Sequence, residues 1–204
     1  MVTHFQNKSF EYCKSLILNA IKGGVTSIQL REKNKELFEV YDLALKLKSC
    51  LTPLNIPLII NDHIQIAKAI DAEGVHLGQS DISPNEARKL IGSHKIIGLS
   101  IETYEELEIA NQLTCIDYVA ASAVFPSKTK SNCKTIWGIE GLRQIIRLSK
   151  HPVVAIGGID TNNIRMIFES GVCGAAVVNA IHDSVDPKKK ASQLLAHACS
   201  SQRR

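Results

Sequence analysis

The sequence has few aromatic residues and no long apolar segment, and both shortages exclude classes of protein. Only 5% of its 204 residues are Phe, Trp or Tyr, so an interleaved basic and aromatic surface for nucleic acid is not predicted. The apolar runs, such as residues 153–156, have the length of a strand, whereas a membrane helix needs roughly 20 apolar residues. The N-terminus also lacks the apolar core of a signal peptide. We therefore expect a cytoplasmic protein that binds neither nucleic acid nor a membrane.

Paired cysteines are missing as well. The six cysteines are scattered without any CxxC pair, which argues against a zinc site and against a thioredoxin-like motif. A reactive thiol would also need a positioned base, which the sequence does not reveal. We interpret the cysteines as reduced thiols that fill small spaces.

The composition that remains is typical of one globular domain, which we expect to cover residues 1–204. The chain is 45% hydrophobic and 22% charged, and it is long enough to bury a substantial core, although it is short for a barrel. Its net charge of +4 favours small phosphorylated ligands as partners. The sequence predicts no oligomeric state.

Strand-like and helix-like segments alternate along the chain. Short β-branched runs precede longer stretches with apolar residues at three- and four-residue spacing. Strands are predicted at residues 25–30, 57–61, 74–77, 95–99, 117–121, 153–156 and 174–178. Helices are predicted near residues 9–22, 35–50, 63–70, 84–91, 103–112, 139–150, 161–169 and 187–198. This alternation predicts parallel strands joined by crossover helices.

The strand pattern leads to a fold prediction of the α/β class. Residues 1–4 can supply a short additional strand, which predicts a single (β/α)8 TIM barrel with a shortened first strand. An open, doubly wound sheet is the alternative. In a barrel, ligands bind at the C-terminal ends of the strands, and polar residues follow most of the predicted strands here.

Two cations follow the first of the seven clear strands. In the segment Gln29-Leu30-Arg31-Glu32-Lys33, alternation directs Gln29, Arg31 and Lys33 to one side. An Arg offers a planar fork and a Lys a mobile charge, which together suit a diphosphate. A solvated charged loop is the alternative explanation.

Two carboxylates follow the next two strands. Asn61 and Asp62 end one strand, and Asp81 comes shortly after the other. Mg²⁺ prefers oxygen ligands and takes one or two carboxylates together with waters and substrate phosphate oxygens. The pair therefore predicts one Mg²⁺ ion beside a diphosphate. Each Asp alone fits equally well as a helix or turn cap.

Hydroxyls, positive charge and glycines follow the remaining strands. Ser100 ends one strand, and residues 125–130 form a loop of sequence FPSKTK that suits a phosphate. Gly158 and the Val178-Asn179 pair follow the last two strands, where barrel enzymes often bind phosphate. Taken alone, these segments also fit a surface loop and simple turns.

Two histidines near these strands are not assigned to catalysis. His76 lies inside an apolar strand, where we expect a hydrogen-bonded histidine in the barrel. His63 is expected to face solvent.

Several segments, in the correct order and spacing, resemble the thiamine-phosphate synthase family. They are GGVTSIQLREKN, LIINDHIQIAKAIDAEGVHLGQSD, IIGLS, VFPSKTK, VVAIGGID and GAAVVNAI, and they span residues 23–181. The resemblance implies a Mg²⁺-dependent transferase that joins a pyrimidine methyl diphosphate to a thiazole phosphate, giving thiamine phosphate and pyrophosphate. In that reaction the diphosphate ionises to a pyrimidine-methyl cation, which the thiazole nitrogen captures, so no protein nucleophile is needed.

The resemblance also implies roles for individual residues. Those implied for the pyrimidine diphosphate are Gln29, Leu30, Arg31, Glu32, Lys33, Asn61, Ser100 and Lys130. Asp62 and Asp81 resemble the Mg²⁺ ligands. The segment implied for the thiazole phosphate comprises Ser127, Lys128, Thr129, Gly158, Val178 and Asn179. Arg31, Lys33 and Lys130 are the predicted catalytic residues, because positive charge stabilises the charge that develops on the leaving group.

The chain departs from the family pattern at four places. His4 stands where an Asp is usual, Ser127 where a Thr is usual, and Ser122-Ala123 where Gly-Pro is usual. Asn179 replaces a Ser, which would crowd the thiazole phosphate unless backbone amides provide most of the contacts.

Two other functions stay open from the sequence. A thiazole tautomerase shares the barrel, but such enzymes tend to lose the aspartate and the T-K loop that Asp81, Thr129 and Lys130 preserve here. They also carry a histidine at the position of Ala123. A non-catalytic paralogue that binds a phosphorylated ligand is the second alternative, because of the short first strand and Asn179.

Overall fold

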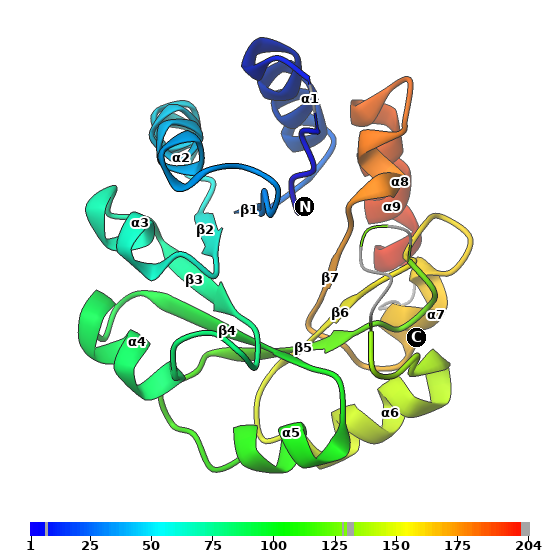
Figure 1. Cartoon of the computed structure of the whole chain (residues 1–204). Coiled ribbons are helices and arrows are strands. Elements are labelled where there is room, and N and C mark those ends of the chain that lie inside the picture. Colours follow the sequence, from blue (N-terminus) through cyan, green and yellow to red (C-terminus); the bar gives the residue numbers. More distant parts are fainter. Residues whose placement is uncertain (7, 128, 130–132, 201–204) are drawn as a thin grey trace.

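The computed structural model describes residues 1–6, 8–127, 129 and 133–200, and a curved parallel sheet lies at its centre (Figure 1). The sheet order follows the sequence from β1 to β7, and every neighbouring pair is parallel. The strands are β1 (Ile28–Leu30), β2 (Leu58–Asn61), β3 (Gly74–Leu77), β4 (Ile96–Ile101), β5 (Tyr118–Ser122), β6 (Val153–Ile156) and β7 (Gly174–Ala176). All of the predicted strands are therefore confirmed, although some of their ends shift.

Helices surround the sheet on its outer side (Figure 1). They are α1 (Phe10–Lys22), α2 (Leu37–Leu51), the 3₁₀ helix η1 (Thr52–Leu54), α3 (Ile64–Ala69), α4 (Pro84–Ile91), α5 (Tyr104–Ala110), α6 (Gly138–Leu148), α7 (Ile164–Glu169), α8 (Asn179–His182) and α9 (Pro187–Cys199). The expected start of α4 is confirmed, because the Ser83 hydroxyl accepts a hydrogen bond from Glu86 N. Only the short helices η1 and α8 have no counterpart among the predicted helices.

The core lies between the sheet and this ring of helices. Apolar strand residues such as Leu30, Ile60, Leu77 and Ile97 are at most 1% exposed. Removing each such side chain from water contributes about 1.5–3 kcal/mol. Continuous apolar runs thus fold into buried parallel strands, and the polar residues that follow them are left at the strand ends.

Residues 1–3 lie between the two outer strands of the sheet. Val2 forms an isolated parallel bridge with Gln29 of β1, and Val2 N donates a hydrogen bond of 2.9 Å to the Val177 carbonyl just after β7. Thr3 N donates to the Gln29 carbonyl, and Gln29 N donates to the Met1 carbonyl. These bonds amount to one bridge and not a full ladder.

The predicted closure of the sheet into an eight-stranded barrel is corrected. The described residues form seven strands and one bridge, because the N-terminal segment is too short to pair along the edges of β1 and β7. The open doubly wound alternative is wrong, because its strand order reverses at a switch point, whereas the order here is sequential.

Glu32 fixes the N-terminal segment against the end of β1. Its carboxylate accepts hydrogen bonds from the Thr3 hydroxyl at 2.7 Å and from Phe5 N at 3.0 Å. The Thr3 oxygen accepts in turn from Arg31 N at 3.0 Å. Glu32 is only 9% exposed, so its charge is stabilised by these donors. The backbone of Arg31 is thereby held in place.

Within the described ranges, no helix is both long and apolar enough to cross a membrane.

Candidate active site

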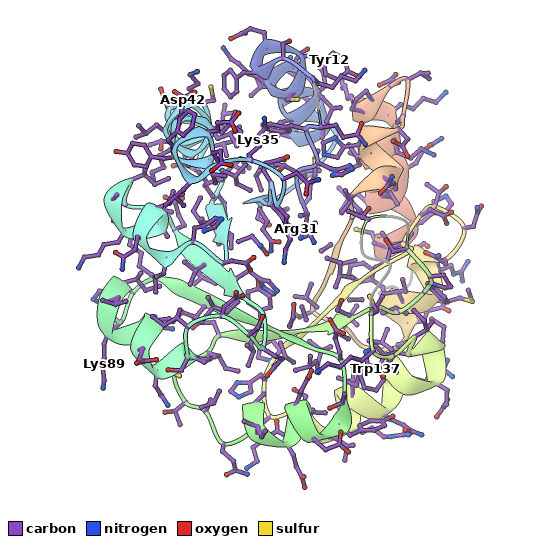
Figure 2. The ribbon with its side chains drawn as sticks, in the orientation of Figure 1. Tyr12, Arg31, Lys35, Asp42, Lys89 and Trp137 are labelled. Atoms are coloured by element: carbon purple, nitrogen blue, oxygen red, sulfur yellow. The ribbon has the colours of Figure 1, made fainter. Side chains whose placement is uncertain are left out.

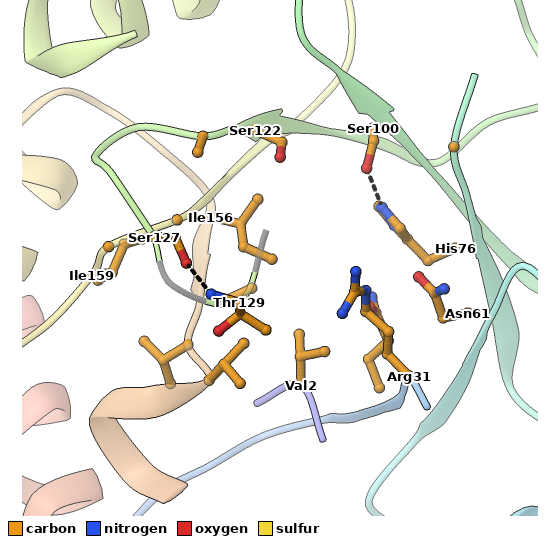
Figure 3. A pocket seen from close by; sticks show the side chains of 18 of the residues that line it. Val2, Arg31, Asn61, His76, Ser100, Ser122, Ser127, Thr129, Ile156 and Ile159 are labelled. Atoms are coloured by element: carbon orange, nitrogen blue, oxygen red, sulfur yellow. Dashed lines mark hydrogen bonds between the residues drawn. The ribbon is translucent and has the colours of Figure 1, made fainter. Parts of the chain in front are cut away.

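A pocket of about 670 Å³ lies at the C-terminal ends of the strands. Figure 3 shows Arg31, Asn61 and His76 on one side of it, and Ser127, Thr129 and Ile159 on the other. The predicted site residues that line the pocket are Gln29, Arg31, Lys33, Asn61, Asp62, Asp81, Ser100, Ser127, Thr129, Gly158, Val178 and Asn179. Residues from all seven strand ends thus meet in one cavity, as parallel strands require.

Positive and negative groups meet on the first side of the pocket. Lys33 Nζ lies 3.5 Å from Asp62 Oδ2, and the Arg31 side chain extends toward the centre of the ring of strands (Figure 2). Burial raises the pKa of Asp62, the neighbouring Asp81 raises it further, and Lys33 opposes the shift. The two carboxylates are therefore close enough to repel each other.

This pair of carboxylates fits a divalent cation. Asp81 Oδ2 accepts a 2.6 Å hydrogen bond from Gly78 N, which fixes its orientation. No cluster of three or more His, Cys, Asp or Glu side chains suited to a metal occurs in the part of the chain that the structure describes. Two carboxylates are nevertheless sufficient for Mg²⁺, which keeps several waters and substrate oxygens as ligands.

His76 lines the pocket and forms hydrogen bonds through both ring nitrogens. Its Nε2 is 2.8 Å from Ser100 Oγ, and its Nδ1 is 2.9 Å from the Tyr118 hydroxyl. The expectation of a hydrogen-bonded histidine inside the sheet is confirmed. His63 is exposed, as expected.

Hydroxyl groups and glycine backbone form the second side of the pocket. Ser127 Oγ accepts from Thr129 N at 3.3 Å (Figure 3). Gly158 has a φ of 62°, and a Cβ there would lie 2.6 Å from the Pro126 carbonyl. Only glycine therefore lets the segment after β6 lie against the loop after β5.

Asn179 joins the same loop to helix α8. Its Oδ1 accepts a hydrogen bond from the Thr129 hydroxyl, and its Nδ2 donates to Asp183 Oδ2 at 3.0 Å. The departure from the family's usual Ser thus has a structural role, because the longer side chain reaches the loop and occupies the Thr129 hydroxyl.

A second group of charges in the pocket was not predicted. Lys134 Nζ lies 2.6 Å from Glu106 Oε1, and Lys134 N donates to Glu102 Oε2 at 2.9 Å. Glu102 and Glu106 are 8% and 9% exposed. They hold the far end of the loop after β5. In the sequence, Glu102 and Glu106 lie about 30 residues before Lys134, and no pattern connects them to it.

The side chains of two predicted contact residues point away from the pocket, and their contact with the diphosphate stays a prediction. Leu30 is 1% exposed and belongs to the hydrophobic core, while Glu32 is bound to Thr3 and Phe5. Alternation along β1 explains both, because neighbours of Gln29 and Arg31 face the other way. Lys128 and Lys130 lie outside the described residues.

The fold and the pocket define the class of protein. A curved parallel sheet ringed by helices, with its pocket at the strand ends, is the TIM-barrel type of α/β protein. Similarity to orotidine 5'-phosphate decarboxylase from Pyrococcus horikoshii, at 15% identity and a TM-score of 0.72, supports this fold alone.

Comparison with known proteins gives the family. The family model described as thiamine monophosphate synthase matches residues 1–181. A thiamine-phosphate synthase from Vibrio campbellii is 46% identical over 182 residues, which are 89% of each chain. One from Chlamydia abortus is 40% identical over 95% of this chain and 91% of its own length. The chain therefore belongs to the thiamine monophosphate synthase family.

A solved structure agrees with this assignment. Thiamine phosphate pyrophosphorylase from Pyrococcus furiosus is 32% identical, with a TM-score of 0.86. The alignment covers 98% of this chain and 94% of that one.

Proposed function

We propose that the pocket joins a pyrimidine methyl diphosphate to a thiazole phosphate and releases pyrophosphate, as a thiamine-phosphate synthase. The observation that carries the proposal is the division of the pocket into two sides. One side has cations beside paired carboxylates, and the other has hydroxyls and glycine backbone. The names of the relatives identify the same reaction.

The first side is proposed to bind the pyrimidine diphosphate. Arg31 and Lys33 contact its phosphate oxygens, Gln29 and Asn61 bind the pyrimidine end, and Ser100 donates its hydroxyl to the diphosphate. Support comes from the position of all five side chains in one pocket. Lys130 completes this set by its place in the family pattern.

Asp62 and Asp81 are proposed to hold one Mg²⁺ ion. The support is the raised pKa of Asp62, which has burial as its main cause and the Asp81 carboxylate as its second. A divalent cation between the two groups would remove their repulsion. When bound, the ion would neutralise charge on the diphosphate.

The second side is proposed to bind the thiazole phosphate. Ser127 offers a hydroxyl, and Thr129 offers a second one once the Asn179 side chain releases it. The segment at Gly158 and the start of α8 at Val178-Asn179 offer backbone N–H groups. Lys128 adds positive charge by its sequence position. The two ligands would then approach each other across the centre of the pocket.

The protein's part in the reaction is to position the two substrates and to neutralise charge. As the bond to the diphosphate breaks, negative charge develops on the leaving oxygens, where Arg31 and Lys33 stabilise it. The thiazole nitrogen then forms the new bond to the pyrimidine methylene carbon. No protein nucleophile is needed for these steps.

We also propose that residues 1–204 form one domain, in which residues 1–3 connect the two outer strands of the sheet. The bonds of Val2 to β1 and to the Val177 carbonyl support this role. Val2 itself lines the pocket.

The test is turnover by purified protein supplied with both substrates, with and without Mg²⁺. We expect Mg²⁺-dependent formation of thiamine phosphate and pyrophosphate in equal amounts. Thiazole isomerisation without pyrophosphate release would identify a tautomerase, and binding of both ligands without any product would identify a binding protein. Either result would contradict the proposal.

A further inference from the structure

Three residues form a row across neighbouring strands, and the first of them, His76, lines the pocket. In the parallel register, His76 of β3 pairs with Gly98 of β4, and Gly98 pairs with Tyr118 of β5. Register partners in a parallel sheet point to the same face. A Cβ at Gly98 would lie 2.1 Å from Cζ of Tyr118. The missing side chain at Gly98 therefore lets the His76 and Tyr118 rings stack, with their centroids 5.6 Å apart.

The stacked rings are linked to Ser100 by hydrogen bonds. Ser100 lies two residues beyond Gly98 on β4, so it shares the inner face but stands closer to the strand end. His76 Nε2 is 2.8 Å from Ser100 Oγ (Figure 3), and Nδ1 is 2.9 Å from the Tyr118 hydroxyl. Burial raises the pKa of Tyr118, so the phenol keeps its proton at neutral pH.

The chain Tyr118–His76–Ser100 has two arrangements of its protons when the imidazole is neutral. In the first, the Tyr118 hydroxyl donates to Nδ1 and Nε2–H donates to Ser100 Oγ, so the Ser100 proton is free to face the pocket. In the second, Nδ1–H donates to the Tyr118 hydroxyl oxygen, and the Ser100 hydroxyl donates its proton to Nε2. Only the first arrangement leaves Ser100 able to donate to an anionic ligand.

We propose that Tyr118 and His76 are positioning residues that hold Ser100 with its hydroxyl proton directed at the ligand's diphosphate. The inference rests on the proposed function, which assigns Ser100 to the diphosphate. The anionic ligand fixes the direction of the Ser100 proton, because a phosphate oxygen only accepts hydrogen bonds. In this proposal both residues act through Ser100.

The first test measures the tautomer of His76 by ¹⁵N NMR in labelled protein saturated with inorganic pyrophosphate and Mg²⁺. The inference expects a proton on Nε2 and none on Nδ1. In Tyr118→Phe, the Nδ1 resonance should shift because its donor is lost. A proton on Nδ1 in the wild-type protein would overturn the inference. This measurement needs no turnover, so it remains valid if the proposed reaction fails.

The second test is a double-mutant cycle between Tyr118→Phe and Ser100→Ala. We expect Tyr118→Phe to lower kcat about tenfold with little change in KM, and Ser100→Ala to lower kcat by about 10²–10³. In the Ser100→Ala background, Tyr118→Phe should have no further effect. Equal effects of Tyr118→Phe in both backgrounds would mean a merely structural role and would overturn the inference.

Control variants separate positioning from stability. Tyr104→Phe removes a hydroxyl that bonds Gln144 outside the pocket, and it should leave kcat unchanged. His76→Gln, which keeps an N–H donor, should retain more activity than His76→Leu.

If the wild-type protein shows no turnover, the same cycle is measured as the affinity for inorganic pyrophosphate with Mg²⁺, where non-additivity is again expected. Additive losses in that affinity would overturn the inference, even though the reaction itself had failed.

Discussion

At the residue scale, the two carboxylates of the pocket have different surroundings. Asp62 is partly buried beside Lys33, whereas Asp81 is oriented by Gly78 N. Replacing Asp81 by Ala removes one proposed metal ligand and leaves the remaining charges of the pocket in place. We expect Mg²⁺-dependent turnover to fall by about 100-fold or more, while the unfolding temperature stays within a few degrees of the wild-type value.

A product assay over a Mg²⁺ titration, together with thermal unfolding, checks this expectation. Asp42→Asn is the matched control, because Asp42 is an exposed residue of α2 that pairs with Lys46. Wild-type rates in Asp81→Ala would refute its assignment as a metal ligand.

Asn179 tests the thiazole side of the pocket. Its side chain occupies the Thr129 hydroxyl and bonds Asp183. Asn179→Ser should free Thr129 for the phosphate and lower KM for the thiazole phosphate by about three- to tenfold, the worth of one modest hydrogen bond. Steady-state kinetics with that substrate varied checks this, with Asn85→Ser on the exposed side of α4 as the control. A higher KM would mean that the Asn179 amide itself binds the phosphate.

Sequence reasoning succeeded for single residues wherever alternation and strand ends decided the outcome. Alternation predicted that Gln29, Arg31 and Lys33 face the same side, and all three residues line the pocket. Leu30 and Glu32 were predicted as part of one continuous family motif, but alternate residues of a strand face opposite sides, so their side chains lie outside the pocket. Lys134 was missed because its partners, Glu102 and Glu106, are distant in the sequence.

At the scale of elements, Glu32 connects β1 to the N-terminal segment. Glu32→Ala would leave the Thr3 hydroxyl and Phe5 N buried without their acceptor, at a cost of about 1–3 kcal/mol. Urea unfolding should show a lower midpoint, whereas Glu108→Ala on the exposed face of α5 should show almost no change. An unchanged midpoint in Glu32→Ala would mean that water replaces the carboxylate.

Helix α8 contributes a pH dependence of stability. Burial lowers the pKa of His182 to about 4 from 6.5, and its buried Nε2 has no hydrogen-bond partner among the residues that the structure describes. Between these pH values the unfolded chain binds more protons than the folded chain. Stability should therefore be full above pH 6.5 and fall as the pH drops toward 4, by at most about 3 kcal/mol.

Urea unfolding at a series of pH values measures this loss. His182→Gln should flatten the pH profile between 6.5 and 4, whereas His94→Gln, which removes an exposed histidine, should keep the wild-type profile. A profile unchanged by His182→Gln would assign the acid sensitivity to other groups.

Elements were predictable where they were long and regular. The alternation of apolar runs located every strand of the sheet, because buried parallel strands and amphipathic helices have different periods. The bridge formed by residues 1–3 was not predictable in the same way, because three residues are too few to show a period. Helix α8 spans only Asn179–His182 and was interpreted as part of a phosphate-binding turn.

At the scale of the whole molecule, ligand binding in the pocket should stabilise the fold. The lining residues come from every strand, so unfolding of the sheet destroys the site. A ligand at 100 times its Kd adds about 2.7 kcal/mol, which corresponds to roughly 5–10 °C in a chain of this size. Pyrophosphate with Mg²⁺ should therefore raise the unfolding temperature, while either alone should have a much smaller effect.

Differential scanning calorimetry of the wild-type protein with each addition checks this expectation. Sulfate at the same ionic strength is the control for general anion effects. An equal rise with pyrophosphate alone would mean that the cations suffice and that Asp62 and Asp81 hold no ion during binding.

The bond between Val2 and Val177 has a consequence for the order in which the chain assembles on the ribosome. Val2 can meet β1 early, but its other partner follows β7, close to the far end of the sequence. Contacts between such distant residues form late, since the long intervening chain must be ordered first. Until then, both outer strands expose unpaired backbone groups that another chain can bind. A nascent or truncated chain that ends before β7 thus has an aggregation-prone sheet and no complete pocket.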